Sequence, residues 1–257
     1  MANCKVIAVT NQKGGVGKTT TAINLAAYVA QSGRRVLLVD FDPQGNATSG
    51  YGIEKNQLET SCYDVLMGDV AAEQVIIPTV ISNLSILPSN IDLAAAETDL
   101  VNMPSRESAL KRALDPIKDN YDYIFIDCPP SLGLLTLNAL VASDSVIIPI
   151  QSEFFALEGL SQLMNTVKIV RQRLNAQLNV NGVILTMYDT RTIMSKQVTD
   201  EIYKYFGEKI YTVPVPRNIK LVESPSFGVP IAVHAPSSSG AVAYEALAKQ
   251  FLEREEK

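Results

Sequence analysis

The stretch "VTNQKGGVGKTT", residues 9–20, joins a β-branched run to a helical pattern and contains two lysines, Lys13 and Lys18. Its glycines allow backbone amides to approach a ligand without interference from side chains. A helix that begins directly after such a turn adds the partial positive charge of its N-terminus. Strand, glycines, lysine and helix therefore occur in the order that a phosphate-binding loop requires.

The common phosphate-loop pattern, G-x-x-x-x-G-K-[ST], fits this stretch with one departure. Its first glycine would fall at position 12, where the chain has Gln12. The remaining residues keep their chemical roles, because Lys18 supplies positive charge and Thr19 offers a hydroxyl to Mg²⁺. A phosphate loop usually needs one lysine, so Lys13 requires a separate explanation.

Beyond the loop, short β-branched runs alternate with helical patterns. The runs lie at 5–10, 35–40, 84–89, 121–127, 145–151, 182–189 and 210–216, and the helical patterns at 18–32, 105–118, 132–142, 154–174, 194–206 and 239–254. Apolar runs of this kind are typical of a parallel sheet that is covered on both faces. We predict a single α/β domain over residues 1–257, of the P-loop NTPase class. Its twisted, mostly parallel sheet should have about seven or eight strands with helices on both faces.

Acidic residues follow two of these runs, at the strand ends where such sheets bind ligands. The segment "VLLVDFDPQGN" contains Asp40 and Asp42, two residues apart and so on the same side of an extended chain. One could serve Mg²⁺ and the other a water molecule, although such a pair could also cap the following turn. The run "YIFIDCPPSLG" contains Asp127, the form expected of a carboxylate that holds Mg²⁺ through water.

Composition favours an ordinary globular protein with one sizeable core, since 47% of the 257 residues are hydrophobic and 19% are charged. Three cysteines at no metal-ligand spacing indicate a reducing compartment. No apolar run approaches the roughly 20 residues that span a bilayer, so we expect a cytoplasmic protein without membrane partners. The net charge of −5 conceals an excess of +5 in residues 160–220, where nine Lys or Arg stand against four Asp or Glu.

The segment "KGGVGKTT" resembles the deviant Walker A motif of the ParA/MinD ATPases. The resemblance implies ATP and Mg²⁺ as cofactors, with Lys13 reaching across a nucleotide-sandwich dimer to the partner's phosphates. It also implies that Asp42 orients or activates the attacking water and that Asp40 lies near the metal, with Thr19 and Asp127. The implied nucleotide contacts are Lys13, Gly14, Gly15, Val16, Gly17, Lys18, Thr19 and Thr20, and, through the match of "VPVPRN" to an adenine-binding stretch, Pro216 and Asn218.

The stretches "DPQGNATSG", "IPIQSEFFALEGLSQL" and "VPVPRNIKLVESPSFGVPI" are similar to the chromosomal ParA proteins called Soj. That similarity implies an ATP-driven homodimer that binds double-stranded DNA without sequence preference and is associated with the nucleoid. A ParB-type activator would stimulate its slow ATP hydrolysis and release it from DNA. The matching DNA contacts are Arg191, Arg217 and Lys220, all within the basic segment, where such contacts should weaken steeply with salt.

Several alternatives stay open from the sequence. Each of these basic residues could be a solvated surface charge, and an orphan ParA-like ATPase could position another cargo. A MinD-like membrane-associated ATPase would need a basic amphipathic end, whereas this chain ends "YEALAKQFLEREEK". The segment "TMYD" resembles a guanine-reading motif with Met187 in place of lysine, which leaves Asp189 as an argument for GTP; we expect ATP.

Overall fold

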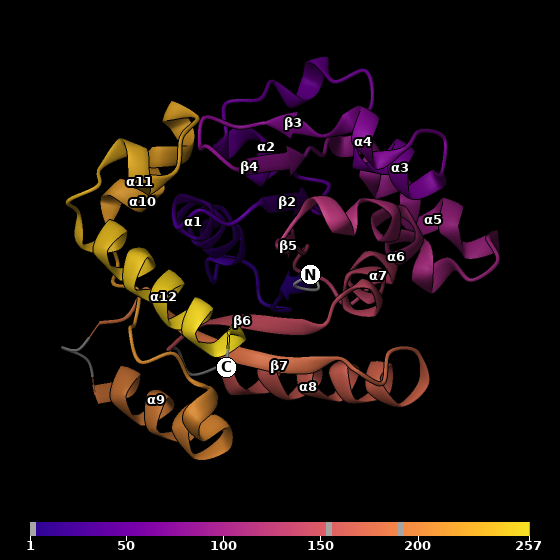
Figure 1. Ribbon diagram of the computed structural model, residues 1–257. Coiled ribbons are helices and arrows are strands. Elements are labelled where there is room, and N and C mark those ends of the chain that lie inside the picture. The colour runs from indigo at the N-terminus through magenta and orange to yellow at the C-terminus, as the bar shows by residue number, and fades with distance from the viewer. Residues whose placement is uncertain (1–3, 153–155, 190–192, 257) are drawn as a thin grey trace.

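The strands of this protein lie in one sheet, and their hydrophobic residues point alternately to its two faces. The computed structural model describes residues 4–152, 156–189 and 193–256 and, within them, one seven-stranded sheet (Figure 1). Its strands are β1 (Lys5–Val9), β2 (Val36–Asp40), β3 (Ile77–Pro78), β4 (Leu84–Leu87), β5 (Tyr123–Asp127), β6 (Ser145–Gln151) and β7 (Asn179–Thr186). The order is β3-β4-β2-β5-β1-β6-β7, and of the pairings only that of β3 with β4 is antiparallel.

Helices cover both faces of the sheet (Figure 1). One face carries α1 (Lys18–Gln31), α2 (Asn46–Gly50), α10 (Ile219–Glu223), α11 (Ile231–His234) and α12 (Ser239–Glu255). The other carries α3 (Cys62–Met67), α4 (Ala72–Val75), α5 (Ala96–Asp99), α6 (Ala109–Leu114), α7 (Leu134–Ala142), α8 (Ala156–Arg173) and α9 (Ile193–Phe206). This arrangement confirms the predicted fold class.

Side-chain alternation along β1 explains why both faces are covered. Val6 and Ala8 pack into the core beneath α7 and α8, whereas Ile7 and Val9 pack into the core beneath α1 and α12. All four are fully buried. A strand that is apolar on both sides is stable only between two layers of helices, as in parallel α/β sheets generally.

The prediction of a strand over 210–216 is wrong. This segment runs beside β7 but forms only isolated bridges there, from Ile210 to Val183 and from Pro216 to Tyr188. The N–H of Tyr211 donates to Val183 and that of Val215 to Leu185, so four residues of this segment span the length of two in β7, and a continuous ladder does not form. The two-residue β3 was not predicted, because it is too short for a periodic pattern.

The helical pattern over 105–118 is also broken in the structure. Only α6 is α-helical, and it lies between two 3₁₀ segments, Arg106–Ser108 and Asp115–Asn120. Ser105 precedes them with a φ of 51°, a left-handed conformation that interrupts a helix, and Pro116 lies near the start of the second segment.

The register of three central strands gathers the predicted site at one edge of the sheet. Asp40, the last residue of β2, is paired with Asp127, the last residue of β5. Asp127 is paired in turn with Val9, the last residue of β1. The strand order changes direction at β1, between β5 and β6, and ligands of open α/β sheets bind outside the carboxyl ends at such a point.

Candidate nucleotide and magnesium site

The loop between β1 and α1 requires glycine at two positions. Gly15 has a φ of 74° and Gly17 a φ of 84°, both in the left-handed region that disfavours other residues. Gly17 is the N-cap of α1, so the loop passes directly into the first helical turn. The backbone amides and the helix N-terminus thus face the same region, as an anion-binding loop requires.

Gly14 is different, because nothing in its own chain requires a glycine there. It is exposed, its φ is not in the left-handed region, and an added Cβ would meet no heavy atom within 4 Å. A side chain at this position would project into open space. Any constraint on its size must therefore come from outside the described part of the chain.

Lys18 is buried and lies close to the carboxylates. Its Nζ donates a hydrogen bond to the carbonyl oxygen of Lys13, 3.2 Å away, so the side chain curls back across the loop. Burial lowers the pKa of the Lys18 amine, and the negative charges of Asp127 and Asp42 act in the opposite direction. A buried ammonium group with one carbonyl partner is well suited to receive a phosphate oxygen.

Asp40 is fully buried and connects β2 to α2. Its Oδ2 accepts hydrogen bonds from the backbone N–H and the hydroxyl of Thr48, both at 2.7 Å. Burial raises the pKa of Asp40 to about 6, although the hydrogen bonds from Thr48 favour its charged form. This carboxylate therefore holds the segment after β2 in place, in addition to any role near a metal.

Asp42 lies two residues further on, where the chain leaves the sheet. Its Oδ1 accepts the backbone N–H of Gln44 at 2.9 Å, and its backbone carbonyl accepts the N–H of Gly45 at 2.9 Å. The aspartate thus caps the turn that follows, as the alternative interpretation of the sequence allowed. Only one of its carboxylate oxygens is used in this way, which leaves the other oriented by the turn.

Asp127 is the most unusual group at this edge. Both of its carboxylate oxygens are buried, and neither accepts a well-formed hydrogen bond within the described residues. Burial raises its pKa well above the usual range and the nearby charge of Asp40 raises it further, whereas Thr19 and Lys18 lower it. A buried carboxylate of this kind fits a divalent cation, directly or through water, because the cation supplies the missing charge.

No cluster of three or more histidine, cysteine, aspartate or glutamate side chains suitable for a metal occurs in the described chain. Mg²⁺ at nucleotide sites is held by few protein ligands and is completed by phosphate and water. Asp127 and the hydroxyl of Thr19 would hold such an ion, with Asp40 beside them.

Burial of two carboxyl groups makes the stability of the nucleotide-free protein depend on pH. Asp40 and Asp127 have raised pKa values, so the folded chain retains protons that the unfolded chain releases. Their stabilising effect is complete below their unfolded pKa of 3.8 and is lost as the pH rises, through about 6 for Asp40. We expect the melting temperature to fall between about pH 5 and about pH 7.5.

The Asp127→Asn variant separates the contribution of Asp127 from the effect of pH on the stability of the rest of the chain. At about pH 7.5 it should melt higher than the unmodified chain, by roughly 2–4 °C for about 1 kcal/mol, and at about pH 4 the two should melt together. Thermal unfolding followed by circular dichroism measures both values. Equal melting temperatures at the higher pH would mean that the Asp127 carboxylate carries no penalty from burial.

A cavity of about 330 Å³ adjoins the loop and is large enough for a nucleobase. Gly17 and Thr20 form the side nearest the loop, and Pro216 and Asn218 lie in its wall. The Asn218 amide is already engaged, since it accepts from Lys220 N at 2.7 Å and donates to the Ser239 hydroxyl at 2.8 Å.

Asp189, the residue that kept GTP open, does not line this cavity. It lines an adjoining groove with Tyr188 and Val213, which shares Pro216 and Arg217 with the cavity, whereas Met187 lies in the cavity wall. Met187 adopts a φ of 48°, which is strained for a bulky residue.

The structure describes two of the three predicted DNA contacts. Arg191 lies outside the described residues. Arg217 is exposed and borders both the cavity and the groove. Lys220 is about half exposed, and its Nζ forms an ion pair with Glu223 at 2.8 Å.

Sequence reasoning missed the contacts that join this site to the rest of the fold. The hydroxyl of Thr186, at the end of β7, donates to the carbonyl oxygen of Val16 at 2.8 Å. The hydroxyl of Thr48 donates to Asp40 and accepts from the backbone N–H of Ser89 at 2.9 Å. Threonines are common, and no local signal distinguished these two from the others.

Comparisons with known proteins agree along nearly the whole chain. A family model described as an AAA domain matches residues 4–180. The chain is 58% identical over 246 residues to the sporulation initiation inhibitor protein Soj of Bacillus subtilis, covering 96% of this chain and 97% of that protein. It is 50% identical over 251 residues to the chromosome partitioning protein ParA of Myxococcus xanthus, covering 98% and 89%.

Solved structures give the same picture of the fold. A cobyrinic acid a,c-diamide synthase from Mycobacterium smegmatis, with bound ADP and magnesium, matches with a TM-score of 0.87 and 39% identity, covering 99% of this chain and 96% of that one. A plasmid partition protein from Borrelia burgdorferi matches with a TM-score of 0.78 and 28% identity, covering 97% and 99%. In the described residues, no helix is long and apolar enough to span a membrane.

Proposed function

This chain belongs to the ParA/Soj family of chromosome-partitioning ATPases, and we propose that it is an ATP-dependent switch that dimerises and binds DNA. Relatives named for chromosome partitioning are 47–50% identical to it with nearly full coverage, and the Soj protein of B. subtilis is 58% identical. The diamide synthase is less similar, at 39% identity. We therefore assign the chain to partitioning.

The observation that carries the proposal is the convergence of Lys18, Asp42 and Asp127 at one edge of the sheet. Lys18 would bind a phosphate oxygen of ATP, and Asp127 with Thr19 would hold Mg²⁺, which supplies charge that neutralises the phosphates. Asp42 would orient or activate the water that attacks the terminal phosphate. Its orientation by the Gln44 amide keeps the carboxylate at this edge before the nucleotide binds.

Dimerisation would complete the site, with Lys13 acting on the nucleotide of the partner subunit. The side chain of Lys13 is partly exposed and lies on the same loop as Gly14, where the chain is open to its surroundings. A second cation beside the transferred phosphoryl group would stabilise the charge that develops there, as an arginine finger does. Hydrolysis in the dimer and release by a ParB-type activator would then reset the switch.

DNA binding rests on the excess of basic residues in 160–220 and on Lys220 in particular. Contacts from such residues to phosphates release counterions, so affinity should fall steeply with salt and show no sequence preference. Because a dimer presents each contact twice, DNA should be bound with ATP and released with ADP.

The test measures binding of duplex DNA of arbitrary sequence with a non-hydrolysable ATP analogue, with ADP and without nucleotide, at two salt concentrations. Lys220→Glu should weaken binding several-fold and reduce the salt slope by about one unit for each phosphate that is no longer neutralised. Lys111→Glu is the matched control, because Lys111 is similarly exposed and paired with Asp115, on the other face of the sheet. Equal affinity with ATP analogue and ADP would refute the switch, and binding that Lys220→Glu leaves unchanged would place the DNA surface elsewhere.

A further inference from the structure

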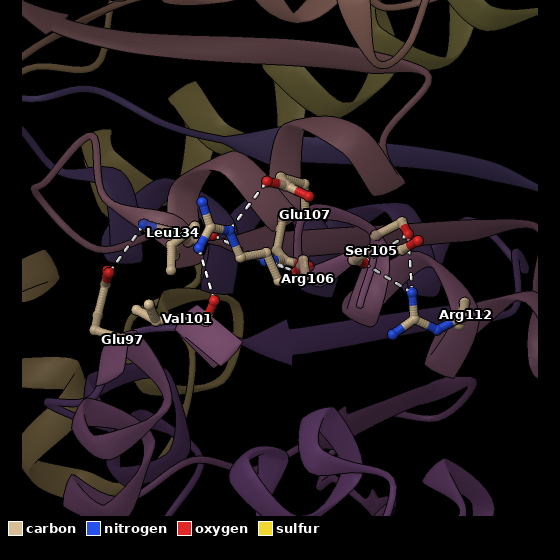
Figure 2. Close-up of polar contacts among 9 residues, drawn as sticks. Glu97, Val101, Ser105, Arg106, Glu107, Arg112 and Leu134 are labelled. Carbon is tan, nitrogen blue, oxygen red and sulfur yellow. Dashed lines mark hydrogen bonds and ion pairs between the residues drawn. The ribbon is translucent and has the colours of Figure 1, made fainter. Parts of the chain in front are cut away.

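Helix α7 begins after the six-residue loop that follows Asp127, and its first turn is capped by a residue from a distant part of the chain. Its own N-cap, Gly133, has no side chain to offer. Instead, the carboxylate of Glu97 accepts the backbone N–H of Leu134 at 2.9 Å and that of Leu135 at 3.3 Å. Figure 2 shows Glu97 pointing toward the start of the helix. A carboxylate is the favoured group at this position, because it satisfies open amides and complements the helix dipole.

Gly133 makes this close approach possible. A Cβ at position 133 would lie 2.4 Å from Oε1 of Glu97, so any other residue would displace the carboxylate. The loop of residues 128–133, between Asp127 and α7, is therefore fixed at one end by the last residue of β5 and at the other by Glu97.

The segment that carries Glu97 also touches the other nucleotide-facing loop. Eight residues earlier, the backbone N–H of Ser89 donates to the hydroxyl of Thr48, which is bonded to Asp40. The Ser89 carbonyl lies 2.7 Å from where a Cβ of Gly45 would be, so the turn after Asp42 packs directly on this segment. One short stretch, residues 89–97, thus contacts both loops that follow the acidic strand ends.

The chain beyond Glu97 is braced against α7 as well. Asn138 of α7 donates to the carbonyl of Arg106 at 2.9 Å and accepts the N–H of Leu110 at 3.2 Å. Arg106 in turn donates to the carbonyl of Val101 at 2.8 Å (Figure 2). These bonds fix the chain that follows Glu97 against α7. The contact of Glu97 with the start of α7 is therefore supported by neighbouring contacts and does not depend on one exposed side chain.

We propose that Glu97 is a positioning residue for ATP hydrolysis. By holding the start of α7, it fixes the loop of residues 128–133 relative to the turn after Asp42, because residues 89–97 contact both. The proposal rests on the ATPase function given above. Glu97 touches no reacting atom in this scheme. Its effect on turnover is exerted through the backbone of the 128–133 loop.

The experiment compares Glu97→Ala, Glu97→Gln and the control Glu107→Ala, using steady-state hydrolysis for kcat and KM and the binding of a fluorescent ADP. Glu107 lies ten residues further along the chain and pairs with Nε of Arg106, whereas the bond to Val101 uses another nitrogen of that side chain. Among the described residues, it forms no hydrogen bond with the amides of α7. Glu97→Ala should lower kcat about tenfold or more with KM and ADP affinity unchanged, because a small displacement of catalytic groups has effects of this size. Glu97→Gln retains an acceptor oxygen and should restore most of the rate, and Glu107→Ala should match the unmodified protein.

Hydrogen exchange provides a readout that does not depend on turnover. The amides of Leu134 and Leu135 should exchange faster in Glu97→Ala than in Glu107→Ala. An unchanged kcat in Glu97→Ala, or a loss of rate matched by an equal loss of ADP affinity, would overturn the proposal. Failure of the unmodified protein to hydrolyse ATP would instead refute the proposed function, and the exchange rates would still report whether Glu97 caps α7.

Discussion

The Asp42→Ala protein is expected to bind ATP and to hydrolyse it at least about 100-fold more slowly than the unmodified chain, the usual cost of losing a group that assists proton transfer. Asp42 lies at the site edge without contributing to the phosphate loop, so the loop and Lys18 should keep their affinity for nucleotide. The carboxylate also caps a turn by accepting the Gln44 amide, but the absence of that one hydrogen bond should cost only about 1 kcal/mol of stability.

The variant should therefore accumulate as an ATP-bound dimer. Size-exclusion chromatography with ATP and with ADP measures this directly, and an ATPase assay gives the rate. Asp119→Ala is a suitable control, because Asp119 is exposed near the opposite edge of the sheet and should leave both values unchanged. A fully active Asp42→Ala enzyme would remove Asp42 from the mechanism.

A second substitution tests the dimer itself. Gly14→Val added to Asp42→Ala should give a protein that binds ATP but remains monomeric. A valine at this position has open space within its own chain, so a loss of dimer would reflect a clash with the partner subunit rather than misfolding. Normal dimerisation of the double variant would show that the loop does not face the partner.

Sequence reasoning predicted the parts of the site that are contiguous in the chain. The phosphate loop lies within residues 9–20, and Asp40 and Asp127 are the last residues of apolar strands, so local pattern and chemistry both indicate a site at the strand ends. That these residues lie close together follows from the parallel sheet alone, because the carboxyl ends of parallel strands lie at a common edge. The bond between the Val16 carbonyl and Thr186, 170 residues away, had no such local signal.

The predictions that were wrong are those in which the tertiary structure does not follow the local sequence pattern. The apolar alternation of 210–216 is typical of a strand, but the segment advances four residues for two of β7 and forms only isolated bridges with it. Glu97 lies in a segment for which no sequence pattern predicted a role, 37 residues before the helix that it caps. Capping from a distant segment depends on tertiary placement, which periodicity cannot report.

Lys18→Ala should abolish nucleotide binding within the range that calorimetry can detect, a loss of at least about 100-fold, because charge-assisted bonds to phosphate are the strongest contacts available at the site. The folded chain should tolerate the change. Burial lowers the pKa of Lys18, so removing this amine removes an unfavourable burial, which offsets the loss of a cation beside Asp127, and the melting temperature should fall little.

Lys13→Ala provides the contrast that explains why the loop has two lysines. If Lys13 acts on the partner's nucleotide, its loss should leave ATP affinity of the monomer within a few-fold and remove the acceleration that dimerisation gives. Calorimetry of each variant with ADP, which keeps the protein monomeric in this scheme, separates the two roles from dimer formation. Equal losses of ADP affinity in the two variants would mean that both lysines bind the phosphates of their own subunit. The proposal that Lys13 acts across the dimer would then be wrong.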